Sequence, residues 1–170
     1  MTIVLYGSIL YYIGLKTREV SLVKLREGGF LISKIKQISG RIFDKKLKKY
    51  GINDLNTAQG RIIFVLWQND HIPIGDLARQ TALGKTTLTS MLDRLERSGH
   101  IIQKTDEKDK RKTLVCLTDK SKSLKDRYEA VSQEMTSLFY KGLPEKQIND
   151  FEIFLKLILS NLIKYEEEQK

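Results

Sequence analysis

Residues 74–117 carry the most informative pattern of the chain: IGDLARQTALGKTTLTSMLDRLERSGHIIQKTDEKDKRKTLVCL. Two short helices are expected within it, from Ile74 to Thr81 and from Lys85 to about Ser98, joined by the turn Ala82-Leu83-Gly84. The second has an apolar face at helical spacing, formed by Leu88, Met91, Leu92 and Leu95. Two short helices joined by a tight turn containing glycine are typical of a helix-turn-helix.

The hydrophobic period changes after Gly99. Residues 101–105 and 111–117 are β-branched or alternate between apolar and polar side chains, which indicates strands. Residues 106–110 between them are all charged and are expected to form the turn. Asp109 and Arg111 are spaced to pair with each other across it. The sequence therefore predicts a β-hairpin with a charged tip, which is the wing of a winged helix-turn-helix.

Helices are also expected before the helix-turn-helix and the wing. Apolar residues recur at three- to five-residue steps from about Val23 to Tyr50, where Gly51 ends the pattern. A second helix is expected to start at Asn56, because Gln59 stands three residues further on and completes a capping box. The residues of this helix that are predicted to face the core are Ile62, Ile63, Leu66 and Trp67.

After the wing, Thr118 can cap a helix from Asp119 to about Tyr140, and a last helix follows Pro144. The apolar stripe of the last helix is too extensive for the surface of a monomer, and such patches mark interfaces. The residues predicted to join two subunits are Phe151, Phe154, Leu155, Ile158, Leu159 and Leu162.

These elements predict a mainly α fold with a small β-wing. Residues 23–168 are expected to form one domain, in which residues 56–118 are the winged helix-turn-helix lobe. Residues 23–50 and 119–168 are the expected dimerisation helices. Residues 1–22 form an N-terminal extension, either an extra element that packs on the body or an upstream addition from a misassigned start codon.

The charge of the chain favours an anionic partner. Thirty Lys and Arg oppose 21 Asp and Glu, so the net charge is +9, and the excess lies before residue 121. Such a balance suits nucleic acid or an acidic membrane face. Because a helix-turn-helix precedes the charged wing, we expect DNA rather than a merely solvated surface. No membrane partner is expected.

The exposed face of the second short helix and the wing tip are the predicted DNA contacts. Short hydroxyl side chains let a helix lie deep in the major groove, and a helix N-terminus favours phosphate. Arginines further along are expected to bind phosphates and set the register, while wing bases reach the minor groove or its phosphates. The predicted residues are Lys85, Thr86, Thr87, Thr89, Ser90, Arg94, Arg97, Lys108, Lys110 and Arg111.

Little in the chain suggests catalysis. The single cysteine, Cys116, excludes an intrachain disulfide, and there is no CxxC pair or Cys/His cluster typical of zinc motifs. Neither His71 nor His100 has a second ligand at a suitable spacing. Glycine-rich phosphate loops, nucleophile elbows and paired carboxylates are missing as well. We therefore expect no enzyme, no metal, no cofactor, and a reducing, cytoplasmic setting.

Four motifs in this order resemble the MarR family of transcription regulators, over about residues 24–168. They are Leu55-Asn56-Thr57-Ala58-Gln59 at the helix opening, Leu77-Ala78 with Leu83-Gly84-Lys85-Thr86-Thr87-Leu88-Thr89 in the helix-turn-helix, Leu92-Asp93-Arg94-Leu95-Glu96 with Gly99 at the end of the recognition helix, and Asp106, Asp109, Arg111 and Leu117-Thr118 in the wing.

The resemblance implies a homodimer that binds a pseudo-palindromic operator in double-stranded DNA. It further implies repression by promoter occlusion, relieved by a small aromatic or anionic effector between the dimer helices and the DNA lobe. The alternative function is a winged-helix module that binds protein, with the apolar N-terminal segment as a docking element.

Overall fold

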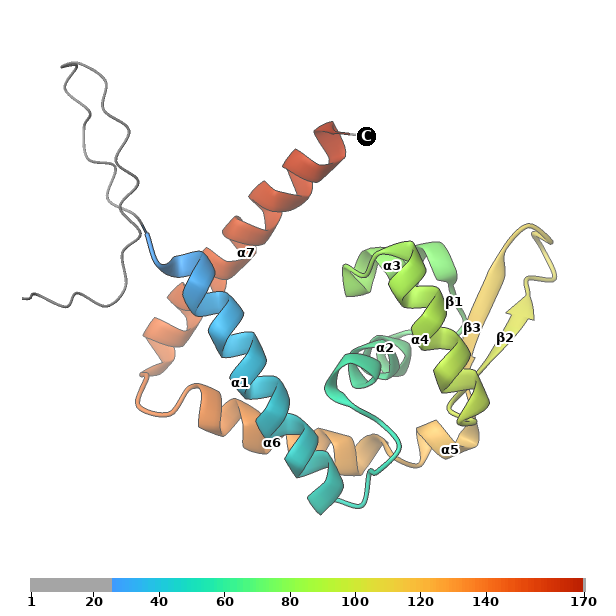
Figure 1. Ribbon diagram of the computed structural model, residues 1–170, viewed down its shortest axis with the longest axis horizontal. Coiled ribbons are helices and arrows are strands. Elements are labelled where there is room, and N and C mark those ends of the chain that lie inside the picture. Colours follow the sequence, from blue (N-terminus) through green and yellow to red (C-terminus); the bar gives the residue numbers. More distant parts are fainter. Residues whose placement is uncertain (1–25, 170) are drawn as a thin grey trace, which may run out of the picture.

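The computed structural model describes residues 26–169, so the features predicted for residues 1–25 lie outside the described residues. A helical arm, formed by α1, α6 and α7, is joined to a lobe that contains α2 to α5 and the three strands (Figure 1). In chain order the elements are α1 (Gly28–Lys49), α2 (Thr57–Gln68), β1 (Ile72–Pro73), α3 (Ile74–Thr81), α4 (Lys85–Arg97), β2 (Ile101–Thr105), β3 (Thr113–Leu117), α5 (Asp119–Lys122), α6 (Lys125–Phe139) and α7 (Glu145–Glu168).

The core lies between α2, α3, α4 and the sheet, and it continues to the inner ends of α1 and α6. The predicted inward faces of α2 and α4 are confirmed: fully buried side chains include Ile62, Ile63, Leu66, Leu88 and Leu95. Trp67 is half-buried, and its Nε1 donates to the Ser121 carbonyl at 3.2 Å. Close packing of the buried α2 and α4 side chains holds the two helices together in the lobe.

The predicted capping box at the start of α2 is confirmed. The Asn56 side chain accepts a hydrogen bond from the Gln59 backbone N–H at 2.9 Å, and the Gln59 side chain accepts one from the Asn56 N–H at 3.2 Å. Thr57 adds a tertiary contact, because both its N–H and its hydroxyl donate to Asp44 of α1. The start of α2 is thus tied to the arm.

The sheet contains one strand more than predicted. Its order is β1-β3-β2, with both pairs antiparallel, and Ile72 and Pro73 pair with Val115 and Leu114. A two-residue strand is too short to show a period in the sequence. Pro73 is tolerated because β1 is an edge strand. The predicted mainly α fold with a small β-wing is confirmed.

The prediction of one helix from Asp119 to about Tyr140 is wrong. The helix is interrupted at residues 123–124, between α5 and α6. There the Ser123 hydroxyl donates to the Lys120 carbonyl at 2.8 Å. The Leu124 N–H then bonds to the Ser121 carbonyl at 3.1 Å, which tightens the turn, and the Leu124 side chain is buried in the core.

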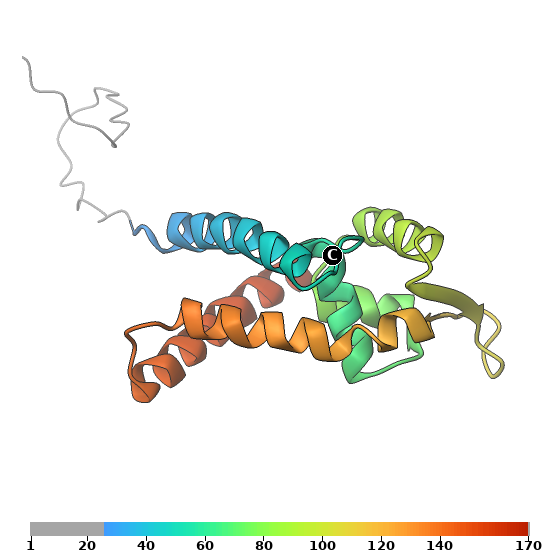
Figure 2. The same cartoon turned by 90° about the horizontal axis from the view of Figure 1, so that it is seen from below.

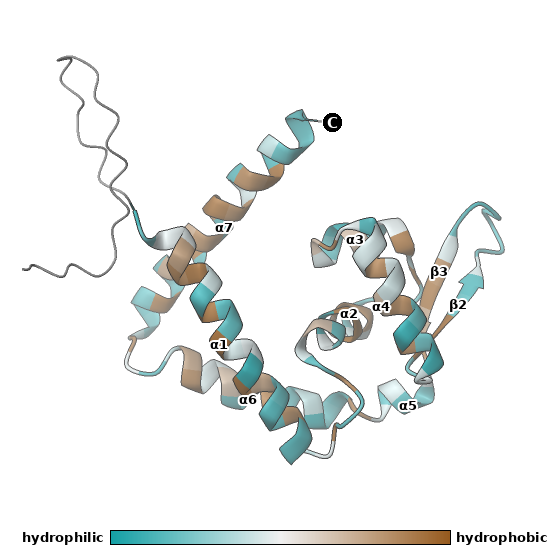
Figure 3. Ribbon diagram, viewed as in Figure 1, coloured by the Kyte–Doolittle hydropathy of each residue, from teal (hydrophilic) through white to brown (hydrophobic). Residues whose placement is uncertain are grey.

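In Figure 1 the second half of α7 extends beyond α1, and in Figure 2 the helix runs obliquely to α1 and α6. It is joined to the end of α6 by a hydrogen bond from Tyr140 Oη to Glu152 Oε1 at 2.8 Å and by the Phe139 and Phe151 rings, whose centroids are 6.5 Å apart. Apolar residues colour much of α1 and α7 brown in Figure 3, yet no described side chain of α7 is buried. Within residues 26–169, none of the helices has the length and apolar character needed to cross a bilayer.

Candidate DNA-binding surface

The helix α4 presents the predicted contact residues to solvent. Its leucines face the core, and Lys85, Thr86, Thr87, Thr89, Ser90, Arg94 and Arg97 are all exposed on the remaining surface. Its N-cap is Gly84, which has no side chain to satisfy the first backbone N–H groups. These N–H groups and the helix dipole make the start of α4 suitable for a phosphate.

Two of these side chains are partly engaged by their own helix. The Thr89 hydroxyl donates to the Lys85 carbonyl at 3.0 Å, and Arg97 Nε donates to the Asp93 carbonyl at 3.1 Å. The Arg94 side chain makes no hydrogen bond or ion pair with any part of the chain that the structure describes, although its backbone carbonyl accepts from the Ser98 N–H. Its whole guanidinium group therefore remains available to an anion.

The wing tip is shaped by Asp109. Its Oδ1 accepts from the backbone N–H of Arg111 at 3.2 Å and from Arg111 Nε at 3.1 Å, so the predicted pairing of these residues is confirmed. The Arg111 side chain lowers the pKa of Asp109 by this hydrogen bond. Arg111 is nevertheless 91% exposed, and Lys108 and Lys110 are exposed beside it. The tip is a hydrogen-bonded turn with basic side chains directed to solvent.

A clamp between α4 and the wing escaped the sequence analysis. The two carboxylate oxygens of Glu96 accept from the backbone N–H and the side-chain amide of Gln103, at 2.8 and 2.9 Å. The hairpin runs beside α4 in Figure 1, and this clamp fixes β2 to it. The partners lie on either side of the turn at Gly99, so no periodic pattern reveals them.

Comparison with known proteins agrees with this geometry. Residues 55–113, which include α2 to the start of β3, match the family model described as MarR family. Residues 55–113 therefore resemble a MarR family domain. This domain is a winged helix-turn-helix of the type found in DNA-binding transcription regulators.

Curated relatives are themselves regulators rather than enzymes. The chain is 29% identical to the HTH-type transcriptional regulator FarR of Neisseria gonorrhoeae over 67% of its length and 75% of that protein. It is 28% identical to the regulator TtmR of Methylorubrum extorquens over 56% of its length, and spans only 49% of TtmR.

Solved structures extend the likeness to the flanking helices. A MarR regulator of Methanosarcina mazei has a TM-score of 0.70 at 24% identity, over 80% of this chain and 96% of that one. Apo MarR of E. coli has a TM-score of 0.63 at 25% identity, over 80% of this chain and 99% of that one. The arm and the lobe together therefore have the MarR fold.

The base of the wing contains a polar cluster around His100. The ring is fully buried, with Nδ1 2.9 Å from the Ser121 hydroxyl and Nε2 3.0 Å from Asp54, the latter without hydrogen-bond geometry. Lys120 also pairs with Asp54 and donates to the Ser98 carbonyl. The cluster joins the loop after α1 to the wing and α5, a role that sequence spacing did not predict.

Burial lowers the pKa of His100, although the Asp54 carboxylate acts in the opposite direction. In the unfolded chain this histidine has its ordinary pKa of 6.5, so below that pH the unfolded state binds the proton first. We expect the melting temperature to fall as the pH is lowered from about 8 to about 5, and His100→Gln to flatten this dependence.

Two groups face the His100 ring, Asp54 and Lys120, and the Asp54 pKa lies below its ordinary value of 3.8, outside this window. Parallel melting curves for the unmodified protein and His100→Gln across the range would contradict the assignment to His100.

Proposed function

We propose that the protein is a homodimeric repressor that binds a pseudo-palindromic operator in sequence-specific fashion and acts in the cytoplasm. The observation that carries this proposal is the exposed hydroxyl and basic face of α4, clamped by Glu96 beside an exposed basic wing. A helix with short side chains can approach base edges closely, while the wing bases are placed for phosphates or the minor groove. The net charge of +9 supports the same partner.

The apolar surface of the arm supports a homodimer. On α7, Phe154 is 61% exposed and Leu162 64% exposed in the single chain, and neither is expected to remain in water. Exposed apolar side chains are also present on α1, at Phe30, Leu31, Ile32, Ile35 and Ile38. Between α1 and α6 lies an apolar groove of about 180 Å³. A second copy of the arm is the occupant that these helices fit.

The dimer would place two α4 helices in successive major grooves, roughly 34 Å apart. Hydroxyl-radical footprinting on the operator tests this arrangement, with two protected patches about one helical turn apart as the expected result. One patch, or protection without defined borders, would contradict a dimer with two recognition helices. Repression then follows because the occupied operator excludes polymerase from the promoter.

Arg111→Ala tests the wing. We expect affinity to fall by a similar factor on specific and unrelated DNA, because a phosphate contact carries no sequence information. The slope of log affinity against log salt should decrease by about 1 per lost contact. Lys164→Ala, which removes an exposed base from α7, is the matched control. Equal affinities for Arg111→Ala and this control would remove Arg111 from the site.

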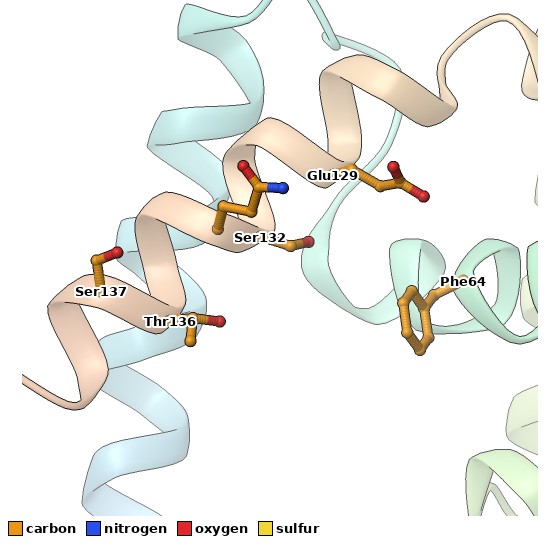
Figure 4. A pocket seen from close by; sticks show the side chains of 6 residues that line it. Phe64, Glu129, Ser132, Thr136 and Ser137 are labelled. Carbon is orange, nitrogen blue, oxygen red and sulfur yellow. The ribbon is translucent and has the colours of Figure 1, made fainter. Parts of the chain in front are cut away.

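The proposed effector site lies between the arm and the lobe. A hollow of about 340 Å³ is lined by Phe43, Thr57, Arg61, Phe64, Tyr128 and Ser132, and it adjoins a second of about 380 Å³. Figure 4 shows Phe64 on α2 across the second hollow from Ser132 and Thr136 on α6. Aromatic rings, hydroxyls and the Arg61 guanidinium together suit a small aromatic anion.

One structural neighbour, CouR of Rhodococcus jostii, was crystallised with p-coumaroyl-CoA at 20% identity to this chain. An effector in the hollow would contact α2 of the lobe and α6 of the arm at once. It would relieve repression by favouring a dimer whose α4 spacing does not match the grooves.

We therefore expect phenolic acids to raise the melting temperature of the protein and to weaken its binding to operator DNA. At 100 times its Kd a ligand adds about 2.7 kcal/mol to the free energy of unfolding. Arg61→Gln should remove most of the ligand's effect on the melting temperature and on operator binding, and it should leave the DNA affinity measured without ligand unchanged. Arg41→Gln, at an exposed position of α1, is the control. A screen in which no phenolic acid shifts either quantity would contradict the proposed effector class.

A further inference from the structure

We propose that Asp70, His71 and Cys116 form a zinc-binding site on the sheet of the lobe. A carboxylate oxygen, an imidazole nitrogen and the thiol sulfur lie within 4.8 Å of one another. Thiolate, imidazole and carboxylate are the ligands that zinc prefers, whereas magnesium and calcium favour oxygen alone. Three protein ligands would leave a fourth position for water.

The fold brings the three residues together through β1. In the antiparallel register Ile72 pairs with Val115, so His71, one residue before Ile72, lies next to Cys116, one residue after Val115. Asp70 and His71 follow α2, and Cys116 belongs to the central strand β3. The sequence distance between the ligands explains why no zinc motif was visible in the sequence.

Asp70 is already oriented for such a role. Its Oδ1 accepts from the backbone N–H groups of Leu117 at 2.9 Å and His71 at 2.8 Å. Its Oδ2 is left 3.5 Å from His71 Nδ1, with Lys122 Nζ further away at 3.9 Å. Zinc bond lengths of about 2.0–2.2 Å separate two tetrahedral ligands by roughly 3.4 Å. The carboxylate and the imidazole thus have nearly the required spacing, and backbone hydrogen bonds hold the carboxylate in place.

The ligands of the proposed site differ in solvent exposure. Cys116 is 2% exposed and lies at the bottom, while the His71 side chain is 59% exposed at the rim. His71 also adopts a left-handed backbone conformation, with φ of 61°. The Cys116 S–H proton passes to solvent as the Zn–S bond forms.

Cobalt(II) provides a selective probe, because Cys116 is the only cysteine in the chain. We expect the reduced full-length protein to take up one equivalent of cobalt per chain, with a near-ultraviolet thiolate-to-cobalt charge-transfer band and visible tetrahedral bands. Zinc should displace the cobalt and raise the melting temperature. Cys116→Ser should abolish the charge-transfer band.

His71→Asn removes the imidazole but keeps a residue that tolerates the left-handed region. We expect it to weaken zinc binding by at least about 10- to 100-fold. Asp119→Asn is the control, because Asp119 contacts the same Lys122 but lies outside the cluster. Equal zinc affinities for His71→Asn, the control and the unmodified protein would overturn the site, as would a protein without a thiolate-to-cobalt band. Neither readout depends on DNA binding, so the result stands apart from the proposed function.

Discussion

Phe154→Glu combined with Leu162→Glu is expected to make the protein monomeric and to weaken its binding to a two-half-site operator by roughly 100- to 10,000-fold. Both side chains are mostly exposed on α7 in the single chain, so the substitutions should not unfold a subunit. In a dimer, however, they would bury unpaired carboxylates in an apolar interface. Without the dimer, each lobe binds its half-site alone, and the gain from linking two binding events is lost.

Sedimentation velocity gives the mass, and fluorescence anisotropy on labelled operator gives the affinity. Lys156→Glu is the matched control, because it adds the same negative charge on the polar side of α7, near Glu152 and Ser160. A double variant that remains dimeric would show that the α7 stripe is not the interface.

Ser90→Glu is expected to lower specific DNA affinity by at least about 100-fold. Ser90 is exposed near the middle of α4, on the face predicted to lie in the major groove. A carboxylate there would meet phosphates and base edges of like charge, which costs several kcal/mol. Because the dimer carries the change twice, both half-sites are affected.

Asn149→Glu adds the same charge at an exposed position of α7 and should retain the affinity of the unmodified protein. Anisotropy titrations at fixed salt compare the two variants with the unmodified protein, and circular dichroism checks that each is folded. If Ser90→Glu and Asn149→Glu bind DNA equally well, α4 is not the recognition helix.

Local signals in the sequence were sufficient for most of the fold. Asn56 and Gln59 locate the start of α2 because capping involves neighbouring residues, and the leucine period of α4 follows from its packing on one face. β1 escaped prediction because two residues carry no period, and it pairs with a distant strand. The interruption between α5 and α6 lies where the Ser123 hydroxyl donates to the Lys120 carbonyl, a local hydrogen bond that a helical pattern does not reveal.

The candidate DNA contacts could be predicted because a recognition helix and a wing are contiguous segments whose exposed faces follow from their apolar ones. The Asp109–Arg111 pair is local in the same way. By contrast, the His100 cluster takes Asp54 from the loop after α1, and the proposed zinc ligands meet only through the pairing of β1 with β3. Such sites arise from tertiary structure and leave no spacing motif.

The measurement that tests the central claim most directly is binding of the purified protein to the DNA upstream of its own gene, across a salt series with competitor DNA. We predict saturable binding that survives excess unrelated competitor and weakens steeply as salt rises, with a slope that reports several phosphate contacts. Binding that competitor abolishes, or that is indifferent to salt, would contradict a sequence-specific regulator and would favour a winged-helix module that binds protein.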